Sequence, residues 1–331
     1  MVVVSQTNGV AQNDVRMWRL QIIRKLGVLF QFCAFAVLLP VIGCSSRSRP
    51  EVVVYCSQDR VYAEPIFADF TRESGIEVKA LFDTEAAKTV GLATRLLAEK
   101  SRPQCDLFWS NEELRTWQLA ARGVLETNWI SMGYRARRLV INTNHLPASG
   151  MRPGLKELAQ PPWRGRVAVA SPLFGTTATY FLALRQHWGD QRWQEWCREL
   201  IANKAMVVNG NSDVVNLVGR GEAWIGLTDS DDVAAGQREG LPIMPLDAAD
   251  VPGMTIPNTV SLVIRRPHPA AAQRLLEFLR QPGIAKRLVE AHALESAAPV
   301  ESVGDRLQAD YARMVRDLDG ATRTLEGIFL K

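Results

Sequence analysis

The sequence predicts an α/β protein of two lobes, each built on an open and mostly parallel sheet. Short apolar runs alternate with segments whose apolar residues recur every three or four positions, which is typical of strands joined by helical crossovers. The apolar runs are continuous, so the strands are expected to be buried on both faces. Removing residues 1–43 from the 331 leaves 288 residues, which is more than one domain of ordinary size.

The first lobe is expected to begin with the order β-α-β-α-β-α. Val52–Tyr55 is an apolar strand, and the helix after it carries its apolar residues on one face, with Pro65 in the first turn and Gly75 ending it. The expected strands of this part are 52–55, 76–78 and 106–109, and the expected helices are 62–74, 85–100 and 112–122.

The second lobe repeats the alternation and is entered and left through two crossing strands, expected at 138–142 and 260–264. Its other expected strands are 167–170 and 224–227, and the remaining expected helices are 177–188, 191–203, 213–219, 270–280, 283–291 and 308–319. We therefore expect lobe 1 to hold residues 51–141 and 262–300, and lobe 2 to hold 142–261 and 301–331.

The N-terminal segment has the pattern of a secretory signal. Four basic residues precede an apolar stretch that ends at Cys44, and a small residue stands before the expected cut. Gln31 and Pro40 interrupt the stretch, which disfavours the alternative of an uncleaved anchor, since a spanning helix needs about 20 apolar residues. Val-Ile-Gly-Cys resembles the bacterial lipobox, so residues 1–43 are expected to be a lipoprotein signal peptide, Cys44 the lipidated residue and 44–50 a tether. Met17 is an alternative start. The protein is expected to be exported and lipid-anchored at the bacterial cell envelope.

Charge and cysteine content narrow the possible functions. The leader holds three of the four formal positive charges, so the rest of the chain is almost neutral and nucleic acid is not an expected partner. Cys56, Cys105 and Cys197 are an odd number with no CxxC pair; we expect buried thiols, with a Cys56–Cys105 bridge as the alternative. No Walker-type loop is present, which excludes a nucleotide hydrolase of that kind.

Several segments in a fixed order resemble bacterial solute-binding proteins of the ferric-binding type, which serve ABC importers. They are 52–59, 63–67, 71–78, 106–109, 163–168 and 221–227. The resemblance covers nearly all of residues 51–300. It implies the two-lobed periplasmic-binding-protein fold (Venus flytrap) with two crossing hinge strands and a ligand in the cleft. It also implies an ABC permease and its ATPase as partners of a monomeric protein.

Polar segments follow three of the expected strands and should face that cleft, because open α/β sheets bind ligands beyond the carboxyl ends of their strands. They supply the candidate ligand-binding residues Ser57, Gln58, Asp59, Asn111, Glu112, Asp229, Asp231 and Asp232. In ferric-binding relatives the second segment supplies a carboxylate ligand and the third a tyrosine pair. This chain has Asn111 at the first place and Asp231 and Asp232 at the second, so the ferric site is not carried over.

The three aspartates allow more than one role. One role is helix capping, with Asp229 as the N-cap and Asp231 and Asp232 near the positive end of the following helix, and at least one of the three is expected to cap. At least one of Asp231 and Asp232 is also expected to meet ligand, either a metal ion or an organic ammonium. A divalent metal would need about six oxygens, with help from Asn111 and Asp59. No cofactor is certain, and a bound metal ion stays open.

Around Phe174–Thr179, in contrast to the acidic cluster, the sequence predicts groups that would bind an anion. Gly175 allows close approach of the backbone, and the N–H groups and hydroxyls of Thr176 and Thr177 would make an anion seat at a helix start; an ordinary helix start is the alternative. Tyr134, Arg135 and Arg137 lie near enough to reach an anionic group, but we expect the arginines to be solvated. An anion seat facing an acidic cluster suits a small zwitterion, such as a phosphonate-like compound, or a metal with a synergistic anion.

The sequence therefore predicts a solute-binding lipoprotein that delivers a small ligand to an ABC importer. No Ser-His or Cys-His arrangement is indicated, so a periplasmic enzyme, which would need a nucleophile and a base in one cleft, is the weaker alternative. A ligand-sensing partner of a membrane receptor is the other alternative.

Overall fold

The computed structural model describes residues 49–83, 89–146, 152–299, 304 and 306–330, and residues 49–331 form one compact unit. The expected signal peptide and Cys44 lie outside the described residues, as does the expected tether except for Arg49 and Pro50. Among the described residues, no helix has the length and apolar character needed to cross a membrane.

Nine strands form one mixed sheet. They are β1 Glu51–Cys56, β2 Glu77–Phe82, β3 Leu107–Ser110, β4 Ile130–Asn142, β5 Val167–Ala170, β6 Met206–Val208, β7 Ile225–Asp229, β8 Ile243–Leu246 and β9 Thr255–Leu262. Their order is β2-β1-β3-β9-β4-β7-β5-β6, and β8 pairs with β4 beside this path. The strand triplets at the two ends are parallel, as the continuous apolar runs predict.

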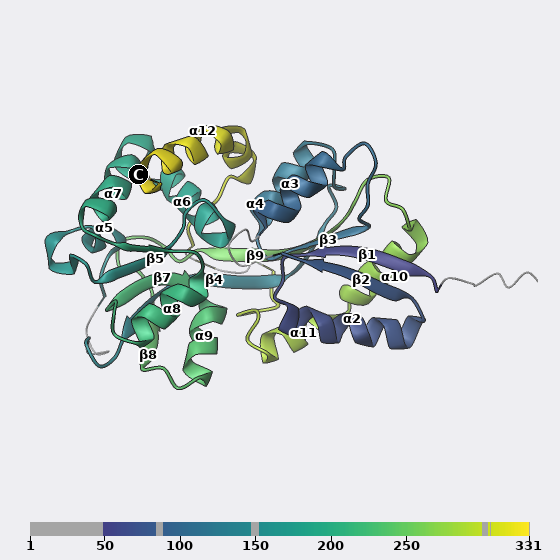
Figure 1. Cartoon of the computed structure of the whole chain (residues 1–331), viewed down its shortest axis with the longest axis horizontal. Coiled ribbons are helices and arrows are strands. Elements are labelled where there is room, and N and C mark those ends of the chain that lie inside the picture. The colour runs from purple at the N-terminus through teal and green to yellow at the C-terminus, as the bar shows by residue number, and fades with distance from the viewer. Residues whose placement is uncertain (1–48, 84–88, 147–151, 300–303, 305, 331) are drawn as a thin grey trace, which may run out of the picture. The chain divides into compact units, whose positions relative to one another are not determined.

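Helices cover both faces of the sheet (Figure 1). They are α2 Arg60–Ser74, α3 Val90–Ala98, α4 Glu113–Ala121, α5 Leu155–Leu158, the 3-10 turn Pro161–Trp163, α6 Gly175–Trp188, α7 Asp190–Ala202, α8 Asn211–Gly219, α9 Ser230–Arg238, α10 Pro269–Leu279, α11 Pro282–Glu290 and α12 Tyr311–Phe329. The helix α2 ends as expected, at Gly75 in the left-handed region with φ 72°. It starts two residues earlier than expected, so Pro65 lies in its second turn rather than its first.

Two strands join the halves of the sheet. The first part of β4 pairs with β9 and its last part pairs with β7 and β8. The strand β9 in turn pairs with β4 and with β3. They are the expected crossing strands, but both begin earlier than the sequence suggested: β4 at Ile130 rather than 138, and β9 at Thr255 rather than 260.

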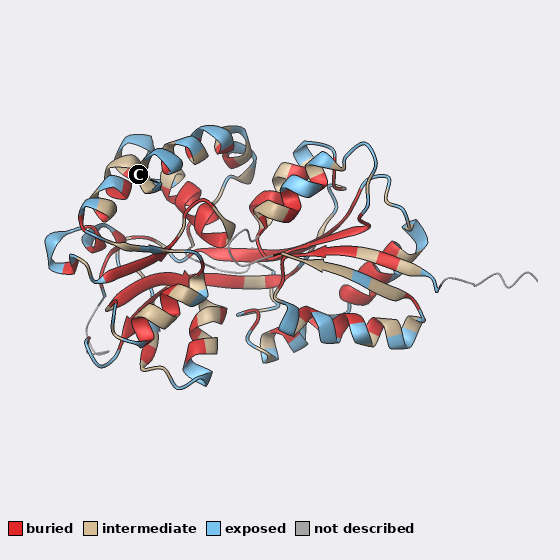
Figure 2. Cartoon of the chain, viewed as in Figure 1, coloured by how far each residue is buried: buried red, intermediate tan, exposed pale blue. Residues whose placement is uncertain are grey.

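The hydrophobic core follows the same division. Two clusters of buried residues flank the half formed by β1, β2 and β3, and two others flank the half formed by β5, β6 and β7. Figure 2 shows that the central strands are almost entirely buried. The helix α12 packs against α4, α6 and α7. The boundaries that we expect for the two lobes stay a prediction.

The cysteine expectation is confirmed for the described part of the chain. Cys56, Cys105 and Cys197 are buried free thiols. Burial raises the pKa of each above its ordinary value, which disfavours the reactive thiolate.

Candidate functional site

The two arginines of β4 are buried, and the expectation that they are solvated is wrong. Arg135 and Arg137 are 2% and 3% exposed, and they lie on the same face of the strand because side chains alternate along it. The Nη1 atom of Arg137 donates to Asp229 Oδ1 at 2.6 Å and to Thr176 Oγ1 at 3.2 Å. A buried guanidinium requires such a counter-charge.

Asp229 ends β7 and is the residue before α9, but its carboxylate makes no capping hydrogen bond. It accepts instead from Thr176 Oγ1 at 2.6 Å and from Asn211 Nδ2 at 2.9 Å, in addition to Arg137. Burial alone would raise the pKa of Asp229, but the charges of Arg137 and Arg135 lower it below its ordinary value. Asp229 is therefore not the aspartate that caps α9, because its carboxylate is an ion-pair partner of β4.

Asp231 is the second residue of α9 and pairs with the other arginine. Arg135 Nη1 donates to Asp231 Oδ2 at 2.7 Å, and Arg135 Nη2 donates to the backbone oxygen of Asn111 at 2.8 Å. Burial, together with Asp229 and Asp59 nearby, raises the pKa of Asp231 although Arg135 opposes the shift. Arg135, Arg137, Asp229 and Asp231 thus form a buried group of two cations and two carboxylates, which we call the arginine–aspartate platform.

A pocket with about 370 Å³ of empty space, part of it open to solvent, lies on this platform. Its lining comes from the N-terminal ends of α6 and α8, from the loop after β3 and from the platform. The lining residues are Asn111, Arg135, Ala170, Ser171, Phe174, Gly175, Thr176, Thr177, Asn209, Gly210, Asn211, Asp229 and Asp232.

The two helix ends at this pocket have no side-chain caps. Phe174 precedes α6 and Gly210 precedes α8, and neither residue supplies a capping hydrogen bond. The first N–H groups of a helix have no partner within the helix, and the positive end of the helix dipole lies there. Two such ends at one pocket form an electropositive rim.

Several buried polar atoms of the platform, of Asn111 and of the loop after β1 have no hydrogen-bond partner among the described residues. They are Ser57 Oγ, Asn111 Oδ1, Arg135 Nε, Arg137 Nε and Nη2, and Asp231 Oδ1. Unsatisfied buried groups are uncommon in folded proteins and need an explanation. Asn111 is the one residue of this group, besides Arg135, that also lines the pocket as described.

The structure brings five of the ten predicted ligand-binding residues to this pocket. Asn111, Thr176, Thr177, Asp229 and Asp232 line it, and Asp231 supports it through Arg135. Ser57, Gln58, Asp59 and Glu112 do not line it. Whether any of the ten binds ligand stays a prediction.

Gln58 and Glu112 have structural contacts that the sequence did not indicate. Gln58 Oε1 accepts from Asn258 Nδ2 at 2.6 Å, and Asn258 Oδ1 accepts from the indole of Trp109 at 2.6 Å. The Glu112 carboxylate caps α4 by accepting from the Leu114 and Arg115 N–H groups. These contacts hold the loops after β1 and β3 in place.

Metal binding at the three aspartates is not favoured by these contacts. One carboxylate oxygen from each of Asp229, Asp231 and Asp232 lies within 4.8 Å of the others. However, Asp229 and Asp231 already pair with arginines, and a hard divalent cation would need about six oxygens. The metal role of Asp231 and Asp232 stays a prediction that the arginine pairs disfavour.

Asn211 belongs to the site but was not predicted. It lines the pocket and bonds to both Thr176 and Asp229. Its signal in the sequence is the Gly210-Asn211 step that follows β6, a strand of three residues that sequence reasoning missed. With β6 assigned, residue 211 would have been placed at the carboxyl end of a strand, where ligands bind.

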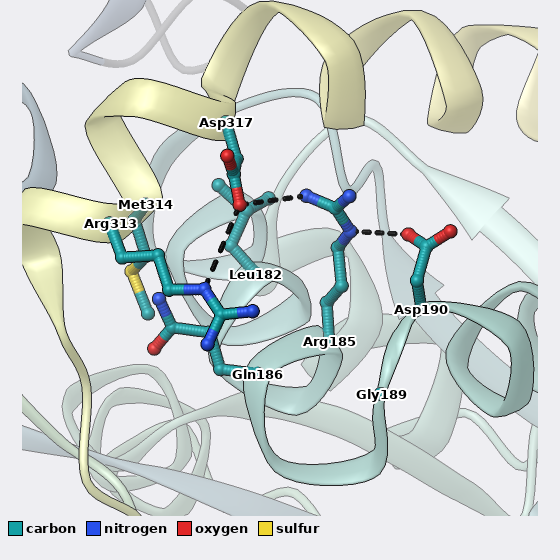
Figure 3. Close-up of a pocket in the computed structure, with 8 residues that line it drawn as sticks. All are labelled: Leu182, Arg185, Gln186, Gly189, Asp190, Arg313, Met314 and Asp317. Atoms are coloured by element: carbon teal, nitrogen blue, oxygen red, sulfur yellow. Dashed lines mark hydrogen bonds and ion pairs between the residues drawn. The ribbon is translucent and has the colours of Figure 1, made fainter.

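Two other pockets are less suited to bind a charged ligand. One, between α6 and α12, has about 410 Å³ of empty space, and its charged groups pair with one another (Figure 3). Arg185 pairs with Asp190 at 2.5 Å and with Asp317 at 3.6 Å. The other has about 1060 Å³ of empty space, much of it open, and is lined by Tyr134, Ala136 and Arg138 on the opposite face of β4. Arg138 pairs there with Asp247 and Glu295.

The sequence is similar to those of known solute-binding proteins. A sequence model of the bacterial extracellular solute-binding protein family matches residues 52–292. The major ferric iron-binding protein of Neisseria meningitidis is 24% identical over 186 residues, which are 50% of this chain and 55% of that protein. The iron uptake protein A1 of Synechocystis is 24% identical over 202 residues, 55% of each chain. The matched part thus spans little more than half the length of these relatives.

Solved structures share the fold over most of the described chain. Iron-bound HitA from Pseudomonas aeruginosa has a TM-score of 0.71 at 17% identity, covering 83% of this chain and 99% of that one. AfuA from Actinobacillus pleuropneumoniae with fructose-6-phosphate bound has a TM-score of 0.70 at 16% identity, covering 85% and 98%. These likenesses confirm the expected two-lobed periplasmic-binding-protein fold.

Proposed function

The chain belongs to the bacterial extracellular solute-binding protein family, and on that premise we propose that it binds a small anionic solute outside the cytoplasm and passes it to an ABC importer. The members of this family are described as solute-binding proteins, which agrees with the expectation that the chain is not an enzyme. The permease and ATPase of the importer, and the monomeric state, belong to this proposal.

One observation is the main support for an anionic ligand. The uncapped N-terminal ends of α6 and α8 meet at one pocket, and helix N-termini bind phosphate and carboxylate groups through free N–H groups. The hydroxyls of Thr176 and Thr177 lie in the same lining. The arginine–aspartate platform beneath is balanced in charge, so it does not repel an anion from the rim.

A ferric site of the phenolate type has no support in this pocket. None of the described residues that line it is a tyrosine or a histidine. Two of the relatives named above are iron-binding or iron-uptake proteins, but a structural neighbour of the same fold holds fructose-6-phosphate. A phosphate- or phosphonate-bearing solute therefore suits the lining better than ferric ion does.

Native mass spectrometry of freshly purified protein, with metal analysis, tests the proposal first, and calorimetry with inorganic phosphate, alkylphosphonates and ferric citrate tests it further. We expect inorganic phosphate or an alkylphosphonate to bind. Tight ferric binding with the orange-red colour of phenolate coordination would contradict the proposal.

A negative charge introduced at the rim tests directly whether the ligand is an anion. Ser171 lines the pocket and is partly exposed. We expect Ser171→Asp to weaken anion binding about tenfold, since two like charges a few ångströms apart near a surface repel each other by about 1–4 kcal/mol. The matched variant Ser171→Asn has the same size without the charge and should bind normally. A tighter complex with Ser171→Asp would indicate a cationic ligand.

The lipid anchor is a separate part of the proposal. The lipobox-like Val41-Ile42-Gly43-Cys44 motivates it, and Cys44 lies outside the described residues. Cys44→Ala should block acylation and normal maturation, leaving a larger or unacylated product in metabolic lipid labelling and mass analysis. Unchanged lipid labelling and mass in this variant would show that the tether is not at Cys44.

A further inference from the structure

The half of the sheet formed by β1, β2 and β3 carries a cluster of exposed cations at the end away from the ligand pocket. Asn111 follows β3 and lines the ligand pocket, whereas the residues that precede β3 lie at the opposite end of that strand. A small pocket with about 210 Å³ of empty space lies there, and Lys100, Pro103, Gly123 and Ile264 are among the residues that line it. Each of these is an exposed cation or the sequence neighbour of one, and we call the four cations the basic end: Lys100, Arg102, Arg122 and Arg265.

Backbone contacts hold the segments of the basic end together. The Nη2 atom of Arg265 donates to the backbone oxygen of Lys100 at 2.8 Å. The N–H group of Ile264 donates to the backbone oxygen of Val124 at 2.8 Å. Three segments that are distant in the sequence therefore meet here: 99–105 before β3, 122–125 after α4 and 263–268 after β9.

The acidic residues near the basic end do not neutralise it. Glu99 pairs with Arg95 at 2.8 Å and Glu126 pairs with Arg266 at 2.6 Å, while Asp106 is fully buried. Within the described part of the chain, none of the four cations of the basic end forms an ion pair. The basic end is therefore a local excess of positive charge on a chain that is almost neutral after the leader, and such an excess attracts an anionic surface.

The folded part of the chain begins beside the basic end. The strand β1 starts at Glu51, whose carboxylate lies 3.8 Å from Nε2 of His268, in the segment that carries Arg265. Figure 1 shows the start of β1 and the connection from β9 to α10 at the same end of the sheet. Pro50 is six residues from Cys44, and six residues span at most about 22 Å. A lipid on Cys44 would therefore keep the basic end within reach of the membrane surface.

We infer that the basic end is a membrane-contact surface that binds the headgroups of anionic phospholipids. A bilayer that contains such lipids has a negative surface potential, and each Lys or Arg close to it strengthens binding about fivefold. This surface is separate from the ligand pocket, and only its access to the membrane rests on the proposed anchor at Cys44. Together with that anchor, the basic end fixes which end of the folded chain faces the bilayer.

Sedimentation with lipid vesicles tests the inference. The probe is the chain from residue 45 onward without lipid, because residues 49–331 form one compact unit and the result then does not depend on acylation of Cys44. Vesicles of phosphatidylcholine alone are compared with mixed vesicles that hold equal amounts of phosphatidylcholine and phosphatidylglycerol. We expect binding to the mixed vesicles only, and weaker binding as sodium chloride is added, because salt screens exposed charges. No binding to the mixed vesicles, or equal binding to both kinds, would overturn the inference.

Two matched fourfold variants locate the contact surface. The first removes the basic end by Lys100→Gln, Arg102→Gln, Arg122→Gln and Arg265→Gln. The control also removes one lysine and three arginines at exposed positions without ion pairs among the described residues, but on or after α7, α8 and α12: Lys204→Gln, Arg198→Gln, Arg220→Gln and Arg323→Gln.

The two variants have the same net charge, so only the position of the lost charges differs. We expect the first variant to bind the mixed vesicles at least tenfold more weakly than the wild type. The control should lose no more than about twofold, because charges farther from the bilayer than the Debye length are screened. Equal losses in both variants would show that net charge rather than the basic end attracts the lipid, and would overturn the inference.

Hydrogen exchange of the wild type gives a test that needs no variant. Mixed vesicles should protect the amides of residues 99–105 and 263–268, and protection confined to α7 or α12 would overturn the inference. The melting temperature and the affinity for inorganic phosphate are measured for both variants, and neither should change, since exposed residues without ion pairs contribute little to stability. A wild type that binds mixed vesicles but no anionic solute would contradict the proposed function and leave the membrane-contact surface standing.

Discussion

Arg137 and Asp229 form a buried ion pair, and the stability of the protein depends on both being present. Their charged atoms lie 2.6 Å apart, and neither side chain is more than 1% exposed. Breaking such a pair leaves one buried charge uncompensated, whereas replacing both charges by apolar groups is often neutral. The pair therefore behaves as one unit.

We expect Arg137→Met to lower the free energy of unfolding by about 3–5 kcal/mol. The double variant Arg137→Met with Asp229→Leu should recover most of this loss, and urea denaturation measures both. Arg138→Met is the matched control, because it removes a neighbouring arginine whose carboxylate partners are partly exposed; its cost should stay below about 1 kcal/mol. Additive losses in the double variant would show that the two residues do not act as a pair.

The roles of single residues were the least predictable part of the site. Asp229 and Asp232 line the pocket, as the sequence suggested for residues near the end of β7. The arginine partners of Asp229 and Asp231 lie 92 and 96 residues away in the sequence. An acidic residue before a helix has the same local pattern whether it caps the helix or pairs with a distant arginine. Only the pairing of β4 with β7 decides between these roles.

The start of α4 shows how a single element is held in place. The Glu112 carboxylate caps this helix and also accepts from Thr179 Oγ1 of α6 at 3.0 Å. Burial raises the pKa of Glu112 above its ordinary value, although Arg115, Thr179 and the capping N–H groups oppose the shift. The folded protein therefore holds a proton on Glu112 more tightly than the unfolded chain does.

This difference makes the contribution of Glu112 depend on pH. With the folded pKa above the ordinary value of about 4.3, the favourable contribution is complete below that value and is lost as pH rises through the folded pKa. Glu112→Gln does not titrate. Urea denaturation between pH 4 and 7 should therefore show the wild type losing stability relative to the variant as pH rises. A wild type that gains relative stability over this range would mean that the capping bonds outweigh burial.

Elements with continuous apolar runs were predicted to within about two residues, whereas short and mixed ones were not. The strand β5 has the expected bounds, and β3 is shifted by one residue. The missed strands are β6, with three residues, and β8, which contains Pro245 and pairs only with β4; proline is typical of such edge strands. The middle of β4 has buried arginines at the alternate positions 135 and 137, and their burial is understandable only from their aspartate partners.

At the scale of the whole molecule, the two strands that cross between the halves of the sheet predict a hinge. Contacts across the halves already exist beside them: Arg238 of α9 donates to the backbone oxygen of Ala291 at 2.9 Å and to the hydroxyl of Tyr62 at 3.2 Å. A ligand that contacts both lobes favours the closed state, because those contacts exist only when the lobes approach.

Small-angle scattering measures this closure. We expect a smaller radius of gyration at saturating ligand than without ligand. The same titration with a compound that does not bind serves as the control. An unchanged radius at saturation would indicate a rigid site or a ligand held by one lobe alone.

The two-lobed organisation was predictable because it depends on chain length and on the alternation of elements. The segments that resemble the family are also spread over residues 52–227 and not confined to one lobe. The chemical character of the pocket was not, because the lining combines residues from five separate stretches of the chain. Their proximity follows from the strand order, which places β4 between β9 and β7, and no local pattern encodes that order.

The alternation along β4 makes this strand unusually intolerant of insertions and deletions. Arg135 belongs to the platform on one face, and Tyr134, Ala136 and Arg138 line the pocket on the other. Losing or gaining one residue here would exchange the two faces for every position that follows. Arg138 would then replace Arg137 opposite Asp229, while the strand pairing itself could persist. Substitutions can alter this site one contact at a time, but a change in the length of β4 would alter all of its contacts at once.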